Sequence, residues 1–170
     1  MSAPALARSR RRTMLLLGTA ALVVVLAVAG YLFQPWRAVV DRTAAESAPV
    51  ATGGAAPPVL ASGDLTSIAH RTTGTVTVQE GADGSRFLRI ENLDTTDGPD
   101  VRVWLSDRDV ADAGSAGDGT WLELGPLRGN KGSLTYPLPA GTTLEDYASV
   151  VLWCKRFGVA FGAAPIGSLQ

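Results

Sequence analysis

The sequence is poor in the two residue types that most often bind transition metals or act as a catalytic nucleophile and base. Its 170 residues include one cysteine, Cys154, and one histidine, His70. A blue-copper centre needs two histidines and a cysteine, a structural zinc site needs four nitrogen or sulfur ligands, and covalent c-type haem attachment needs a Cys-x-x-Cys-His run. None of these sites can be assembled from one copy of the chain.

Hydrolase and phosphate-binding motifs are also missing. His70 could serve as the base of a Ser-His-Asp triad, but the sequence has no Gly-x-Ser-x-Gly elbow. The glycine-rich loops lack the Gly-Lys-Ser/Thr ending that cradles phosphate. A histidine at a strand end, hydrogen-bonded to a turn, is the structural alternative for His70.

The charge is distributed unevenly along the chain. Arginines at positions 8, 10, 11 and 12 precede the first apolar run without any acidic residue. From residue 60 onward, nine basic and 14 acidic side chains give a net charge of −5. Because this part should repel phosphate backbones, nucleic acid is not an expected partner.

Residues 14–33, "MLLLGTAALVVVLAVAGYLF", contain no charged residue. At a rise of ~1.5 Å per residue this run spans ~30 Å, the thickness of the hydrocarbon core of a bilayer. More arginines precede than follow it, so the positive-inside rule predicts a cytoplasmic N-terminus, residues 1–13, and an extracytoplasmic C-terminal part. The sequence thus predicts a single-pass protein of the cell membrane, anchored through residues 14–33.

A cleaved signal peptide is the alternative, with a small-residue site after Ala29 in "AVAG". The apolar run continues through Tyr31, Leu32 and Phe33 beyond that site, which favours an uncleaved signal anchor. The stretch 34–62 that follows is rich in Ala, Pro, Gly, Ser and Thr and predicts a flexible linker.

From residue 63 to residue 170 the pattern changes to short alternating runs separated by turn residues, which predicts strands. The runs are 75–79, 86–92, 101–107, 120–125, 133–138, 149–154 and 159–162. We expect an all-β domain, an antiparallel β-sandwich or barrel-like ectodomain. Its core candidates are Val76, Val78, Leu88, Ile90, Val101, Val103, Leu105, Leu122, Leu124, Val151, Trp153 and Phe157.

Cys154 ends the run "VVLWC" and allows two interpretations. A lone cysteine in such a strand is often a small buried hydrophobic residue. In an oxidising compartment, however, positive charge beside a strand-end thiol favours the thiolate, and with it redox exchange or ligation of a soft metal or haem iron. Because residue 155 points to the opposite face, Arg156 is the better-placed stabilising partner.

The loop "NLDTTDGPD" holds Asp94, Asp97 and Asp100, which are calcium-ligand candidates. Their spacing is not that of an EF-hand, and solvated aspartates that cap turns are the alternative.

Four motifs together resemble the DM-thirteen family, often labelled electron transfer DM-thirteen, in a membrane-anchored form of bacterial type. They are "HRTTGTVTV" (70–78), "LRIENLDTTDGPDVRVWLS" (88–106), "LGPLRGNKGSLTYPLP" (124–139) and "VVLWCKRFGVAFGAAP" (150–165). The resemblance covers about residues 60–167, and Trp-Cys-x-Arg-Phe at 153–157 is its most specific part. It implies an extracytoplasmic β-rich domain in which Cys154 matches a cysteine proposed to act as a bare redox thiol or a haem ligand.

In animals such domains stand beside DOMON domains, whereas this chain carries one DM-thirteen unit alone, so a redox partner protein would act in trans. We therefore expect an electron-transfer accessory domain rather than a stand-alone enzyme, with Cys154 as its redox residue and His70 as a second candidate for proton donation or ligation. The rival hypothesis is a non-catalytic adhesion or ligand-binding module. In it Cys154 packs in the core, and the Asp-rich loops or exposed Trp104 and Trp121 meet a wall polymer, calcium or a partner.

Overall fold

The computed structural model describes residues 3–34, 40–47 and 56–168, with side chains for 14–34, 40–47 and 56–166. The chain forms two compact units, Met1–Trp36 and Arg37–Gln170.

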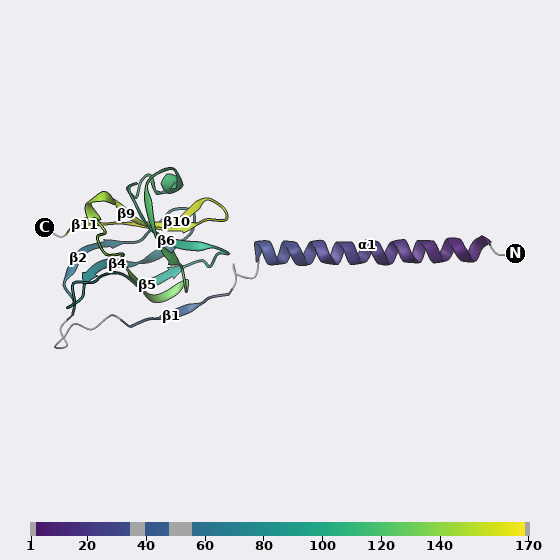
Figure 1. Cartoon of the computed structure of the whole chain (residues 1–170), viewed down its shortest axis with the longest axis horizontal. Coiled ribbons are helices and arrows are strands. Elements are labelled where there is room, and N and C mark those ends of the chain that lie inside the picture. Colours follow the sequence, from purple (N-terminus) through teal and green to yellow (C-terminus); the bar gives the residue numbers. More distant parts are fainter. Residues whose placement is uncertain (1–2, 35–39, 48–55, 169–170) are drawn as a thin grey trace. The chain divides into compact units, whose positions relative to one another are not determined.

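The first unit consists of helix α1, Ala3–Phe33 (Figure 1). Its apolar part is Met14–Phe33, and none of this stretch is buried within the structure. The hydroxyl of Thr19 donates a hydrogen bond of 2.9 Å to the Leu15 carbonyl, so this polar group is satisfied inside the helix. The helix is long and apolar enough to cross a membrane, although a signal sequence would have the same properties.

The second unit is a β-sandwich of two mainly antiparallel sheets (Figure 1). The six-stranded sheet has the order β1-β8-β5-β4-β2-β11, and the five-stranded sheet has the order β3-β10-β9-β6-β7. The strands are β1 Thr43–Ala45, β2 Val59–Asp64, β3 Thr66–Ser67, β4 Thr72–Glu80, β5 Arg86–Thr95, β6 Val101–Ser106, β7 Trp121–Pro126, β8 Lys131–Pro137, β9 Ser149–Cys154, β10 Val159–Pro165 and β11 Gly167–Ser168. The 3-10 segments η2, Ala113–Asp118, and η3, Leu144–Asp146, lie in the connections between strands.

The period-two pattern of the strands produces the core between the sheets. In β4, Val76 and Val78 point inward and are almost fully buried. Strand β9 is buried at every position because its second face is covered as well. Val150, Leu152 and Cys154 pack between the sheets, whereas Val151 and Trp153 belong to an outer cluster with Ala113 and Ala116 of η2.

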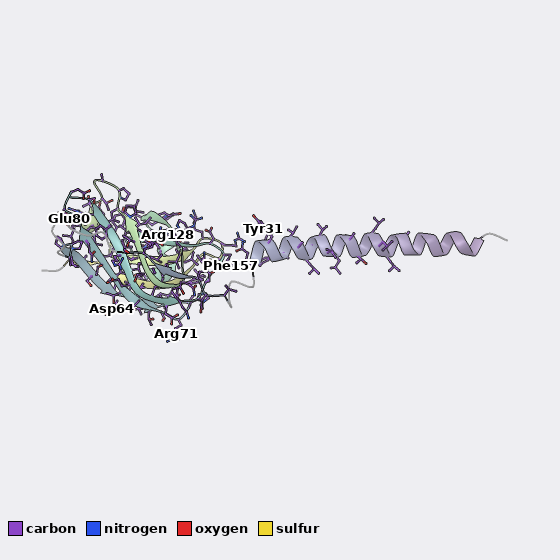
Figure 2. All side chains as sticks on the ribbon, turned by 90° about the horizontal axis from the view of Figure 1, so that it is seen from below. Tyr31, Asp64, Arg71, Glu80, Arg128 and Phe157 are labelled. Atoms are coloured by element: carbon purple, nitrogen blue, oxygen red, sulfur yellow. The ribbon has the colours of Figure 1, made fainter. Side chains whose placement is uncertain are left out.

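The seven strands expected from the sequence correspond to β4–β10. Of the expected core residues, Leu122 and Leu124 are partly buried and pack against the core. Phe157 was wrongly expected in the core: it is 50% exposed, because it lies in the turn between β9 and β10 rather than in a strand (Figure 2).

The structure differs from the expected linker over 34–62 at two places. Residues 43–45 form β1, which pairs parallel with β8, and residues 59–64 form β2, which pairs with β4. Residues 35–39 and 48–55 lie outside the described part of the chain. Strand β1 fits because Gly129 and Gly132 carry no side chain: a Cβ at either would collide with the backbone at Arg42 or Ala44.

Candidate functional site

Cys154 is the last residue of β9 and is fully buried. It pairs with Val101, the first residue of β6, and with Val159, the first residue of β10. Its exposed fraction is 0%, and it is a free thiol within the core between the sheets. The sulfur is therefore enclosed, but at the end of the sandwich where three strands begin or end.

The four residues after Cys154 form an exposed turn, 155–158. The turn closes through the Gly158 amide, which donates to the Cys154 carbonyl at 2.8 Å, and the Lys155 amide donates to the Asp100 backbone carbonyl at 3.0 Å. Gly158 has φ +63°, a left-handed conformation that glycine adopts without a steric penalty. A short turn thus lies between the buried sulfur and solvent.

The charged residues of this turn, Lys155 and Arg156, are exposed to solvent. Lys155 Nζ bonds Glu123 Oε2 at 3.2 Å, and Arg156 is exposed. Within the described part of the chain, no hydrogen bond or ion pair joins Arg156 to Cys154. The role of Arg156 beside the thiol stays a prediction.

His70 lies in the loop between β3 and β4. Its Nδ1 is 2.9 Å from Thr96 Oγ1, and its ring centroid is 3.8 Å from that of Phe161. The His70 amide also donates to the Phe161 carbonyl at 3.2 Å. Among the described residues no interaction joins His70 to Cys154, so a directly paired thiol and imidazole is not seen.

The three aspartates predicted as calcium ligands each have a different cationic partner. Asp94 is 3.8 Å from Lys131 Nζ, Asp97 is 2.6 Å from Arg42 Nη2, and Asp100 is 2.6 Å from Arg102 Nε. No group of three or more His, Cys, Asp or Glu side chains that could hold a metal ion occurs among the residues described. Calcium binding by these three residues stays a prediction, and it would require them to exchange their cations for the metal.

Cys154 does not fit a haem ligand in this conformation. Axial ligation needs an open position at the sulfur into which the ring and its iron can enter. Three cavities of the domain, of about 380, 530 and 450 Å³, are lined by residues other than Cys154. The sulfur itself packs against apolar side chains of both sheets.

A stack of three tryptophans lies on the outer face of the five-stranded sheet. The ring centroids of Trp104 and Trp121 are 4.8 Å apart with planes inclined by 12°, and those of Trp104 and Trp153 are 5.2 Å apart at 22°. Trp104 is 3% exposed, so its expected exposure was wrong, whereas Trp121 is 43% exposed. Trp104 is covered because Trp121 and Trp153 flank it and η2 packs over the same face.

The stack borders a cavity of about 450 Å³, which we call the tryptophan groove. Gly117 fits beside the stack because it lacks a side chain: a Cβ there would lie 2.9 Å from Trp153 Cζ2. The sequence contained an indication of this position. In "VRVWLS" the alternation of a strand places Trp104 on the face away from the core residues Val103 and Leu105. The groove is lined by Trp104, Gly114, Ser115, Gly117, Asp118, Trp121, Trp153, Lys155 and Gly158.

Comparison with known proteins gives one family. A family model described as "Electron transfer DM13" matches residues 64–166, which covers β4–β10 and therefore both Cys154 and the tryptophan groove. No curated protein and no solved structure matches the chain.

Proposed function

Because this chain belongs to the electron transfer DM13 family, we propose that it is an electron-transfer domain with Cys154 as a gated redox thiol. In this proposal residues 14–33 anchor it in the cell membrane, and the β-sandwich lies on the extracytoplasmic side. The observation that carries the proposal is the position of Cys154, which is buried at the last position of β9 and next to an exposed turn.

Local opening gives the thiol its access. Elements near strand ends and exposed turns open at a free-energy cost below that of global unfolding. Release of turn 155–158 breaks the bond between Gly158 and Cys154 and uncovers the sulfur while most of β9 stays paired. The opened turn also frees Arg156 to approach the thiolate, which positive charge stabilises.

The reaction is thiol–disulfide exchange with a partner protein that carries a disulfide and acts in trans. The Cys154 thiolate attacks one sulfur of the partner, a mixed disulfide forms, and the other partner sulfur leaves as a thiolate. A thiolate of an electron donor, a second thiol compound, then attacks the partner sulfur of the mixed disulfide; a donor–partner disulfide forms and Cys154 leaves as a thiolate, reduced as at the start. The two electrons thus pass from the donor thiol to the partner disulfide, and Cys154 mediates the exchange, because this chain has no second cysteine with which to keep a disulfide of its own.

The test is the state of Cys154 in the full chain in native membranes. Thiols are trapped in acid, and the intact mass is measured without reduction, with Cys154→Ala as the control. We expect a mixed disulfide that reductant removes and that the control lacks. A thiol that is always free, and that an alkylating reagent reaches only at the rate of global unfolding, would contradict the proposal.

A ligand-binding module is the second candidate, favoured by the 0% exposure of Cys154 and by the presence of the tryptophan groove. In that case the thiol acts only as packing. A Cys154→Ser variant would then lose stability, because a hydroxyl replaces a thiol in the core, but would keep every interaction of the native protein.

A further inference from the structure

We propose that the tryptophan groove binds a planar, electron-poor ring with carbonyl oxygens, a compound of the quinone class. The proposal deepens the electron-transfer function and rests on it, because it supplies the domain with a small-molecule electron carrier.

The stack itself favours a flat ligand. Its indole planes are inclined by only 12° and 22°, and Trp121 keeps 43% of its surface exposed. A fourth ring placed against Trp121 continues the same stacking. Indole is electron-rich, so an electron-poor ring gains an electrostatic attraction in addition to the burial of apolar area.

The size and opposite wall of the groove suit such a ring. Its volume of about 450 Å³ falls within the range of small-molecule sites. Gly114 and Gly117 present backbone rather than side chains to this space, and a Cβ at Gly114 would have no neighbour within 4 Å. Ser115 and Asp118 of η2 also line the groove with their side chains, so a flat ligand meets backbone alone only at the two glycines.

Lys155 supplies the polar contact that distinguishes a quinone from a plain hydrocarbon. Its ammonium group has three N–H donors, and its described contact with Glu123 Oε2, at 3.2 Å, engages one of them. Lys155 lines the groove and is 47% exposed at its side chain, so it can turn a donor toward a ligand carbonyl. Quinone oxygens only accept hydrogen bonds, which matches a donor at this position.

The groove lies close along the chain to the thiol of the proposed function. Trp153 precedes Cys154 and Lys155 follows it, and both line the groove. Cys154 itself points to the opposite face of β9, into the core. One strand end thus carries the buried thiol on one face and the groove on the other.

The experiment measures binding of 1,4-naphthoquinone-2-sulfonate to the full chain in detergent by isothermal titration calorimetry. The Cys154→Ala background is used because quinones add covalently to thiols and the chain has no other cysteine. We expect saturable binding with a stoichiometry of one. Trp121→Ala should raise Kd at least tenfold, and Lys155→Gln should raise it several-fold.

Phe157→Ala is the matched control, because Phe157 is 50% exposed and lies in the same turn as Lys155 and Gly158, but is not among the residues that line the groove. It should leave Kd unchanged. Naphthalene-2-sulfonate has the same charge without the carbonyls and should bind more weakly than the quinone.

Three outcomes would overturn the inference. They are no saturable binding, equal effects of Trp121→Ala and Phe157→Ala, and preference for a neutral oligosaccharide such as tri-N-acetylchitotriose over the quinone. Because the measurement is made without the thiol, its result is independent of the redox state of Cys154. The calorimetry can therefore contradict the groove proposal without bearing on the thiol proposal, which is tested by the mass of the native chain.

Discussion

Arg42 and Asp97 form a two-point ion pair that joins the segment before β1 to the loop after β5. Arg42 Nη2 lies 2.6 Å from Asp97 Oδ1, and Arg42 Nε lies 2.9 Å from Asp97 Oδ2. The Asp97 side chain is 1% exposed, whereas that of Arg42 is 37% exposed. Asp97 also accepts a bond of 2.9 Å from the Gly98 amide. The carboxylate is thus buried, and a residue from the expected linker neutralises it.

Replacement of Arg42 should destabilise the sandwich. Arg42→Ala removes both bonds to a buried carboxylate, which costs about 2 kcal/mol after allowance for the partial exposure of the arginine. Arg42→Lys keeps the charge but loses the paired geometry, so its effect should be smaller. The loss of stability in each of the two variants is measured as the shift of the urea-unfolding midpoint of the full chain, monitored by tryptophan fluorescence.

Arg71→Ala is the control for this prediction. Arg71 is exposed on the surface of the same domain, and no hydrogen bond or ion pair of its side chain is found in the part of the chain described here (Figure 2). Its substitution should change the midpoint little. Equal losses for Arg42→Ala and Arg71→Ala would mean that net charge, not the contact with Asp97, sets the stability.

The attachment of β1 should depend on pH through Glu46. Two hydrogen bonds of 2.7 Å from Arg128, and a third from the Thr135 amide, lower the pKa of this carboxyl below its ordinary value of 4.5. A lowered folded-state pKa means that the stabilisation is complete above pH 4.5 and is lost as pH falls through the folded pKa. Segment 40–47 should therefore loosen in acid.

Hydrogen exchange of the β1 amides, compared between the native chain and Glu46→Gln at each pH, measures this effect. Protection should fall with acid in the native chain, whereas the variant should be loose throughout. Glu80→Gln, which alters an exposed pair with Arg86 at 3.3 Å, is the control. If the β1 amides of the native chain keep their protection at pH 3, the ionised Glu46 carboxylate does not hold β1 in place.

The sequence predicts an element where the contacts that form it lie close together along the chain, and fails where they join distant segments. Strands β4–β10 were predicted because each is a short run of strand-forming residues bounded by turn residues, most of them with an alternation of apolar and polar positions. Strand β1 was not, because three residues, Thr43–Ala45, show no period, and their pairing depends on Gly132, almost 90 positions later. The position of Cys154 at a strand end was predictable, but its burial depends on the facing sheet.

The tryptophan groove was missed for the same reason. The sequence places Trp104, Trp121 and Trp153 on three separate strands, and only the order β9-β6-β7 brings them together. The cover that buries Trp104 comes from η2, a glycine-rich segment read from the sequence as a turn. Contacts between segments of this kind require the folded chain.

Gly117 and Gly114 provide a matched pair for testing the stack. Both lie in η2, but a Cβ at Gly117 would lie 2.9 Å from Trp153 Cζ2, whereas one at Gly114 would have nothing within 4 Å. Gly117→Ala should displace Trp153 and cost about 1–3 kcal/mol, as overpacking does. Gly114→Ala should be close to neutral. Near-UV circular dichroism, which reports the coupling of stacked indoles, should change in the first variant alone.

Local opening at Cys154 predicts that loosening the neighbouring turn exposes the thiol, whereas loosening a distant turn does not. Gly158 and Gly84 have φ of +63° and +76°, and a Cβ at either would meet nothing within 4 Å. Alanine at each position thus adds a similar backbone strain of about 1 kcal/mol without a clash. Gly158 closes the turn after Cys154, and Gly84 lies in the β4–β5 hairpin.

The measurement is the rate at which iodoacetamide modifies Cys154 in the full chain under native conditions. If the sulfur reacts through release of turn 155–158, Gly158→Ala should accelerate modification about fivefold, since a change of 1.4 kcal/mol is tenfold, and Gly84→Ala should leave the rate unchanged. If the sulfur reacts only when the whole sandwich unfolds, both variants should accelerate it equally. Equal acceleration would make Cys154 a packing residue and favour the ligand-binding module.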